Sequence, residues 1–166
     1  MAIVLASGRN APVLARRPER LLVEGYRAWL SGYETGSIDC WEIGWQVFVD
    51  ELGSSQARRL YGEISYWVRE TRGCAAQQLR CFPYGCQCLC RDECLLLALV
   101  AAVQNGNDES VARAVGHLAA EEKQEALHRA ARCLAEALDD IHQRLLPVPP
   151  HVIDDVAGRP CLTMFH

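Results

Sequence analysis

The sequence contains very little lysine: of its seventeen basic residues only Lys123 is a lysine, so the other sixteen are arginines. The net charge is -4 at pH 7. An acidic balance argues against the positive surface that non-specific nucleic-acid binding requires, so we expect no nucleic-acid partner. The excess of arginine indicates a GC-rich coding bias, which favours a bacterial source.

Long apolar runs are also missing. The longest, residues 94–103, has ten residues, about half of the ~20 that a membrane-spanning helix requires. The five apolar residues 2–6 follow no basic residue and are too few for a secretion signal. We therefore expect no membrane partner and a cytoplasmic protein. In that reducing compartment, clustered cysteines are more often metal-binding or catalytic than disulfide-bonded.

Several enzyme signatures are absent as well. The chain has no Gly-x-Ser-x-Gly, no phosphate-binding loop and no Gly-x-Gly-x-x-Gly, so hydrolase, NTPase and dinucleotide-binding functions have no support. No pair of strands with a hairpin turn and no internal repeat is apparent. Whether the protein is an enzyme stays open at this point.

What the sequence does contain is helical periodicity. The clearest apolar stripe, with the three- and four-residue spacing of one helix face, comprises Ile38, Trp41, Trp45, Phe48 and Leu52. Residues 90–104 are apolar on all sides in their middle, as expected of a central helix enclosed by its neighbours. The sequence predicts an all-α, single-domain helical bundle of five to seven helices.

The bundle is expected over residues 18–146, after a loose, flexible N-terminal arm (1–17) and before an extended, proline-containing C-terminal tail (147–166). A short helix of two turns is expected over 75–80. A continuous helix over 108–146 would reach ~58 Å at 1.5 Å per residue, too long for a domain of this size. We therefore expect a break near residues 116–120.

Five of the nine cysteines lie within fourteen residues at the start of the buried helix: Cys81, Cys86, Cys88, Cys90 and Cys94. The free N–H groups and positive dipole at a helix N-terminus favour thiolate over thiol. Converging thiolates suit soft metals, so the cluster predicts a zinc, copper or iron–sulfur site. The spacing matches no established zinc or ferredoxin pattern, however, and buried cysteines also serve as small apolar residues.

Arg91, Asp92 and Glu93 directly follow Cys90. Acidic residues in a first helical turn complement the helix dipole, and this explains Asp92 and Glu93 without any further role. The alternative makes all three residues polar partners of the thiols, with Arg91 lowering a thiol pKa.

Three functions follow from these patterns. The first is a regulatory or accessory protein that holds a soft metal through the five cysteines. The second is a metal-free helical accessory protein that contacts a protein partner, or a second copy of itself, through its arm and tail. The third is a thiol redox protein that uses Cys90, or Cys86 with Cys88. The spacing of the cysteines does not decide among them.

Overall fold

The computed structural model describes residues 12–160, and this part of the chain is helical, with one isolated bridge between Ala75 and Ala119. The prediction of an all-α bundle with five to seven helices is confirmed. The elements are η1 (Val13–Ala15), α1 (Arg17–Thr35), α2 (Ile38–Leu52), α3 (Ser54–Cys74), α4 (Arg91–Gln104), α5 (Asp108–Leu118), η2 (Glu121–Lys123), α6 (Gln124–Asp140) and α7 (Pro150–Ala157). No described helix has the length and apolarity that a membrane crossing requires.

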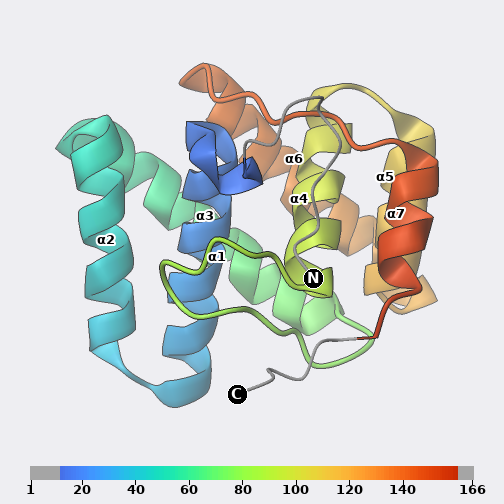
Figure 1. Ribbon diagram of the computed structural model, residues 1–166, viewed down its shortest axis with the longest axis horizontal. Coiled ribbons are helices and arrows are strands. Elements are labelled where there is room, and N and C mark those ends of the chain that lie inside the picture. The colour runs from blue at the N-terminus through green and yellow to red at the C-terminus, as the bar shows by residue number, and fades with distance from the viewer. Residues whose placement is uncertain (1–11, 161–166) are drawn as a thin grey trace.

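The helices form two crossed layers. In Figure 1, α2, α1, α4 and α7 stand side by side, and α3 and α6 cross behind them and pack against each other. Helix α5 covers α4 together with α7. Helix α2 lies at one edge of the molecule and packs against α1 and α3. Helix α4 thus packs against α1, α5, α6 and α7.

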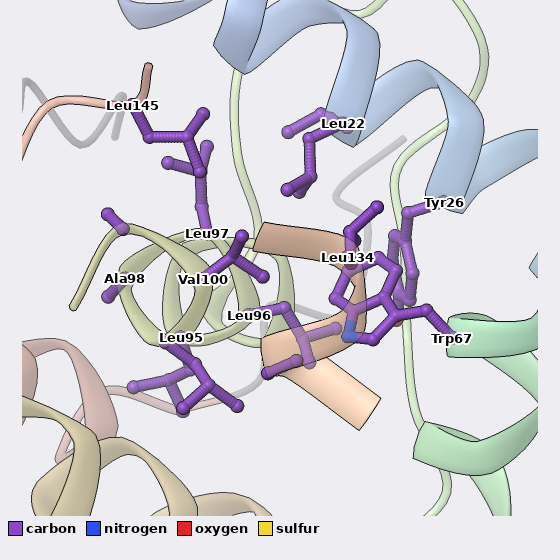
Figure 2. Packing of buried hydrophobic residues seen from close by; sticks show 14 of the residues in the cluster. Leu22, Tyr26, Trp67, Leu95, Leu96, Leu97, Ala98, Val100, Leu134 and Leu145 are labelled. Carbon is purple, nitrogen blue, oxygen red and sulfur yellow. The ribbon is translucent and has the colours of Figure 1, made fainter. Parts of the chain in front are cut away.

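Helix α4 is the centre of the core, as its all-round apolar sequence predicts. Figure 2 shows its side chains pointing in every direction. Every residue from 92 to 102 is buried. Besides α5 and α7, helix α4 meets side chains from α1, α3, α6 and the segment after α6, and these include Leu22, Tyr26, Trp67, Leu134 and Leu145.

Helix ends follow the expected local chemistry. Gly36 and Gly53 end α1 and α2 with positive φ angles of 71° and 76°, a conformation that glycine adopts without strain. Asn107 caps α5, since its side chain accepts a hydrogen bond from the Ser110 N–H at 3.0 Å. The expected break in the last long helical segment is also present, because α5 ends at Leu118 and α6 begins at Gln124.

Two expectations for local structure are wrong. Residues 75–80 form no helix, because contacts with α1, α4 and Ala119 take up their backbone groups. The tail is not extended throughout, because α7 begins at Pro150. Proline suits the first position of a helix, where the N–H has no helical partner. Ile153 and Val156 then bury this helix against the bundle.

The expected N-terminal arm is shorter than 17 residues. Residues 1–11 lie outside the described part of the chain, as do 161–166. Residues 13–15 form η1, in which Leu14 is only 2% exposed. Helix α1 then begins at Arg17. The segment from Val13 onward is therefore part of the packed bundle.

Candidate functional site: a loop held by buried charges

The predicted site lies on the long irregular segment between α3 and α4. We call residues 75–90 the cysteine loop. Loops of this length without regular structure are uncommon in compact domains and are usually functional or disordered. In Figure 1 the loop crosses the face of α1 before it enters α4. Its contacts with these two helices therefore decide whether it has a single conformation.

The first half of the loop is fixed through its backbone. Ala75 forms the bridge with Ala119 beyond α5. At Arg80 the carbonyl accepts a hydrogen bond from the Tyr26 hydroxyl at 2.8 Å. The N–H of the same residue donates to Asp92 at 2.9 Å. Both peptide groups at this point are thus satisfied by side chains of α1 and α4.

The second half is held by Arg27, whose side chain is only 1% exposed. Its guanidinium donates to both carboxylate oxygens of Glu93, at 2.7 and 3.2 Å, and to Glu24 at 3.0 Å. It also donates to the backbone carbonyls of Cys86 at 2.7 Å and Cys88 at 2.8 Å. These five bonds match the five N–H donors of an arginine. One buried side chain therefore joins α1, α4 and the loop.

Besides pairing with Arg27, Glu93 accepts backbone hydrogen bonds at the start of α4. Its carboxylate accepts from the Cys90 N–H at 2.9 Å and from the Phe82 N–H at 3.0 Å. The bond to Cys90 completes a capping box at the N-terminus of α4. The same carboxylate thus caps the helix, fixes the loop and neutralises Arg27.

Glu24 also contacts Arg27, but its hydrogen bonds are incomplete. Its Oε1 atom accepts from Arg27 and, at 3.3 Å, from the Gly85 N–H. Its other oxygen, Oε2, is buried with no hydrogen-bond partner among the described residues. Burial raises the pKa of this carboxyl, and the charge of Arg27 offsets only part of the rise. We call Glu24, Arg27 and Glu93 the buried network.

The thiols nearest the buried network are held neutral. Burial, with the negative charge of Glu93 as the next cause, raises the pKa of Cys90 well above its usual range and that of Cys94 to about 12. Burial also raises the pKa of Cys81 to about 11. The expected stabilisation of a thiolate at the helix N-terminus is opposed by desolvation and by the acidic residues of the first turn.

The thiols of Cys81, Cys90 and Cys94 also have local environments that explain them without a ligand. Cys90 donates to the Arg80 carbonyl at 3.5 Å, and Cys81 lies 3.8 Å from the Ser31 hydroxyl. Cys94 is 3% exposed within the apolar core. These contacts fit cysteine as a small, weakly polar packing residue.

The five cysteines point to different surroundings. Cys90 and Cys94 are buried, Cys81 and Cys86 are half-buried, and Cys88 is exposed. Within residues 12–160, no three or more His, Cys, Asp and Glu side chains are grouped so that they could hold a metal ion. The donor set in this conformation therefore does not fit a soft-metal site. Metal binding by these residues stays a prediction.

Asp92 and Glu93 lie inside the molecule and not on a solvated helix end, and Arg91 beside them is partly buried. Asp92 and Glu93 are 5% and 1% exposed. Arg91 donates to Asp92 at 3.0 Å and to the Ala157 carbonyl at 3.0 Å, at the end of α7. Their charges serve to hold the loop and α7 in place, beyond any effect on the helix dipole.

Sequence reasoning did not single out Glu24 or Arg27, the residues from α1 on which the site depends. One signal was available. Both charged residues interrupt an otherwise apolar part of α1, where Leu22, Val23 and Tyr26 are buried. Charged residues within an apolar helix face are buried with partners or not at all. The partners themselves lie about sixty residues away and have no local signature.

The fold and the site together define a single-domain, all-α protein in which buried ionised groups hold a cysteine-bearing loop. No protein-family model matches the chain, and no curated protein or solved structure matches it either. The function is therefore inferred from the geometry of the site itself.

Proposed function

We propose that the protein is a helical accessory protein that recognises a protein partner with the exposed tip of the cysteine loop. The tip consists of Pro83, Tyr84, Gly85, Gln87 and Cys88, all exposed. Functional residues are often placed on loops that a rigid scaffold positions. The proposal includes a bacterial cytoplasmic setting, with which the eight cysteines free of disulfides in the described chain agree.

The observation that carries this proposal is the set of five hydrogen bonds made by Arg27. Burying charged groups such as Arg27 and Glu93 costs several kcal/mol in desolvation, which is offset only when their hydrogen bonds are complete. A hydrophobic core of the same volume would stabilise the bundle equally well. The buried network adds one defined loop conformation. A loop ordered in advance loses less conformational entropy on binding, which favours affinity.

Tyr84 is the residue best placed to contact a partner. It is 59% exposed and lies in the turn at residues 84–85. The Cys86 N–H donates to the Pro83 carbonyl at 3.1 Å, and Gly85 adopts a φ of 77°. A fixed turn therefore presents the ring to solvent. Tyrosine is enriched among the residues that dominate binding energy at protein interfaces.

A photo-crosslinking phenylalanine analogue at Tyr84, introduced in the cells that make the protein, tests the proposal. A matched chain carries the analogue at Tyr66, which is 41% exposed on α3. We expect a discrete adduct from position 84 only, and a weaker one when Arg27→Lys loosens the loop. The same adduct from both positions, or none from position 84, contradicts the proposal.

The soft-metal function is the alternative, and the accessible Cys86 and Cys88 on one short loop are its support. It requires the loop to rearrange so that thiolates converge. Elemental analysis and an absorption spectrum of anaerobically purified protein test it directly. Stoichiometric zinc, copper or iron that is lost on Cys86→Ser with Cys88→Ser favours the metal function. Metal-free protein with an intact crosslink favours recognition.

A further inference from the structure

A groove at the C-terminal end of α3 has no part in the proposed recognition by the loop tip. It lies between α1, α3 and residues 77–79 of the cysteine loop, and its volume is about 430 Å³. Sites for small molecules usually have volumes of about 300–1,000 Å³. The groove is therefore large enough for a small organic ligand.

Two arginines on consecutive turns of α3 line this groove. The guanidinium of Arg69 lies 5.7 Å from the ring centre of Tyr66, and that of Arg72 lies 5.3 Å from the ring centre of Tyr33. Such stacking restricts the arginine side chains, which therefore lose less entropy when they bind a ligand.

Neither arginine has a carboxylate or hydrogen-bond partner within the described chain. Nine other arginines between residues 12 and 160 form ion pairs with carboxylates, but Arg69 and Arg72 form none and donate no hydrogen bond to a described residue. Their planar donor groups match carboxylate and phosphate oxygens in pairs. The groove thus presents two open anion-binding groups side by side.

The other residues that line the groove indicate which kind of anion it can bind. Gln77 and Gln78 add two amide side chains, and neither is hydrogen-bonded to another described residue. The buried Leu30 and Leu79 provide an apolar floor. Glu34 adds one negative charge, so two arginines and one glutamate leave a net charge of +1. A small anion with a hydrogen-bond donor that faces Glu34 satisfies all of these groups.

We propose that this groove binds a small organic anion through its carboxylate or phosphate group, with Arg69 and Arg72 as the anion-binding residues. The backbone that carries the glutamines is anchored at both ends, by the Ala75–Ala119 bridge and by the contacts of Arg80. The site is thus built on ordered backbone. It is independent of Tyr84 and of the loop tip.

Titration of the full chain with citrate, and separately with inorganic phosphate, tests the proposal by calorimetry and by arginine side-chain NMR signals. We expect saturable binding of at least one probe with a Kd of about 1 mM or tighter. Binding of citrate alone indicates a carboxylate ligand, and binding of phosphate alone indicates a phosphate ligand. Failure of both probes to saturate overturns the proposal.

Two double variants with the same change in charge show where the anion binds. Arg69→Gln with Arg72→Gln removes both groups of the groove, and we expect affinity to fall about tenfold or more. Arg58→Gln with Arg129→Gln removes two exposed arginines that lie outside the groove and form no ion pair in the described chain, and affinity should change less than about twofold. An equal loss in both variants indicates non-specific charge attraction and overturns the proposal.

Discussion

Two regions of the molecule use the same chemistry in different surroundings. The buried network holds the cysteine loop against α1 and α4. Elsewhere on the surface, Arg113 and His117 of α5 hold α7 through Asp154. Arg27 and Glu93 are 1% and 0% exposed in their side chains, whereas Arg113 and Asp154 are 45% and 38% exposed. Each set of charges fastens a peripheral segment to the bundle.

The difference in exposure changes what these ion pairs do. Exposed pairs contribute about 0–1 kcal/mol, because water competes for both partners and salt screens them. A buried pair has lost its water, so removing one partner leaves the other charged and unsolvated. The exposed contact can therefore be lost at little cost in stability, while the buried network is essential to the local structure.

Replacing the central arginine of each region gives the largest expected difference. We expect Arg27→Met to lower the free energy of unfolding by about 3–5 kcal/mol, because Glu24 and Glu93 then remain buried without a counter-charge. Arg113→Met should lower it by about 1 kcal/mol or less. Urea unfolding followed by far-UV circular dichroism measures both values.

Arg27→Lys provides a control for this comparison. It retains the positive charge but loses the planar group that reaches Glu93 and two carbonyls at once. We expect an intermediate loss of stability. Equal losses from Arg27→Met and Arg113→Met contradict the distinction between the two regions.

The two carboxylates of the buried network should also differ in how much each contributes to the stability of the fold. Glu93→Gln weakens two bonds to Arg27 and removes a charged acceptor for the N–H groups of Cys90 and Phe82. We expect a loss of about 2 kcal/mol. Glu24→Gln should cost less than about 1 kcal/mol, because one carboxylate oxygen of Glu24 has no partner to lose and its amide replacement is uncharged. Thermal unfolding of both variants ranks them, and a larger loss at Glu24 contradicts this assignment.

The exposed region should respond to pH in a defined direction. The hydrogen bond from His117, and then the charge of Arg113, lower the pKa of Asp154 below its ordinary value of 3.8. A lowered carboxyl pKa stabilises the fold above the unfolded-state value, and that stabilisation disappears as pH falls through the folded-state value. Asp154→Asn should therefore lower Tm slightly near neutral pH and not at all below Asp154's folded-state pKa.

The raised pKa of Glu24 makes the stability of the fold change with pH in the opposite direction. The folded protein holds this proton more tightly than the unfolded chain, so ionisation of Glu24 opposes folding. Its contribution to stability is largest below the ordinary value of 4.5 and declines as pH rises through the folded-state pKa. In the Glu24→Gln variant this dependence should be absent from a series of Tm values measured against pH. If the Glu24→Gln variant shows the same dependence of Tm on pH as the unchanged protein, the pKa of Glu24 is not raised on folding.

The smallest effect on stability is expected at the loop tip. Cys88→Ser should change the free energy of unfolding by less than about 0.5 kcal/mol, because this side chain is exposed. Alkylation at neutral pH, followed by mass spectrometry, should modify Cys88 much faster than Cys90 or Cys94. Fast modification of Cys90 would favour the thiol redox function, since it requires an accessible thiolate.

Local chemistry explains why so much of the fold could be predicted from the sequence. Gly36 and Gly53 stand where α1 and α2 end, a stop signal that is visible in the sequence, and the sequence of α4 indicated a helix buried on every side. The tail was misjudged at Pro150, because the same residue that ends one helix can begin another. Position in the fold, and not residue type, decides between these two outcomes.

The candidate site could be predicted only in part, for a different reason. The clustering of five cysteines drew attention to this segment, and the structure places Cys81, Cys86, Cys88 and Cys90 on the loop and Cys94 in the buried helix. The function of Arg27 depends on Glu93 and on two carbonyls 59 to 66 positions away. No local pattern encodes such contacts, because they exist only after α1 and α4 pack together.

The bonds from Arg27 to the loop have a consequence for how this surface can evolve. They end on the carbonyl oxygens of Cys86 and Cys88, and every amino acid has such an oxygen. Substitutions at positions 86 to 88 therefore leave this attachment in place while they change the side chains presented to solvent. The protein can acquire a new binding preference there at little cost to its fold.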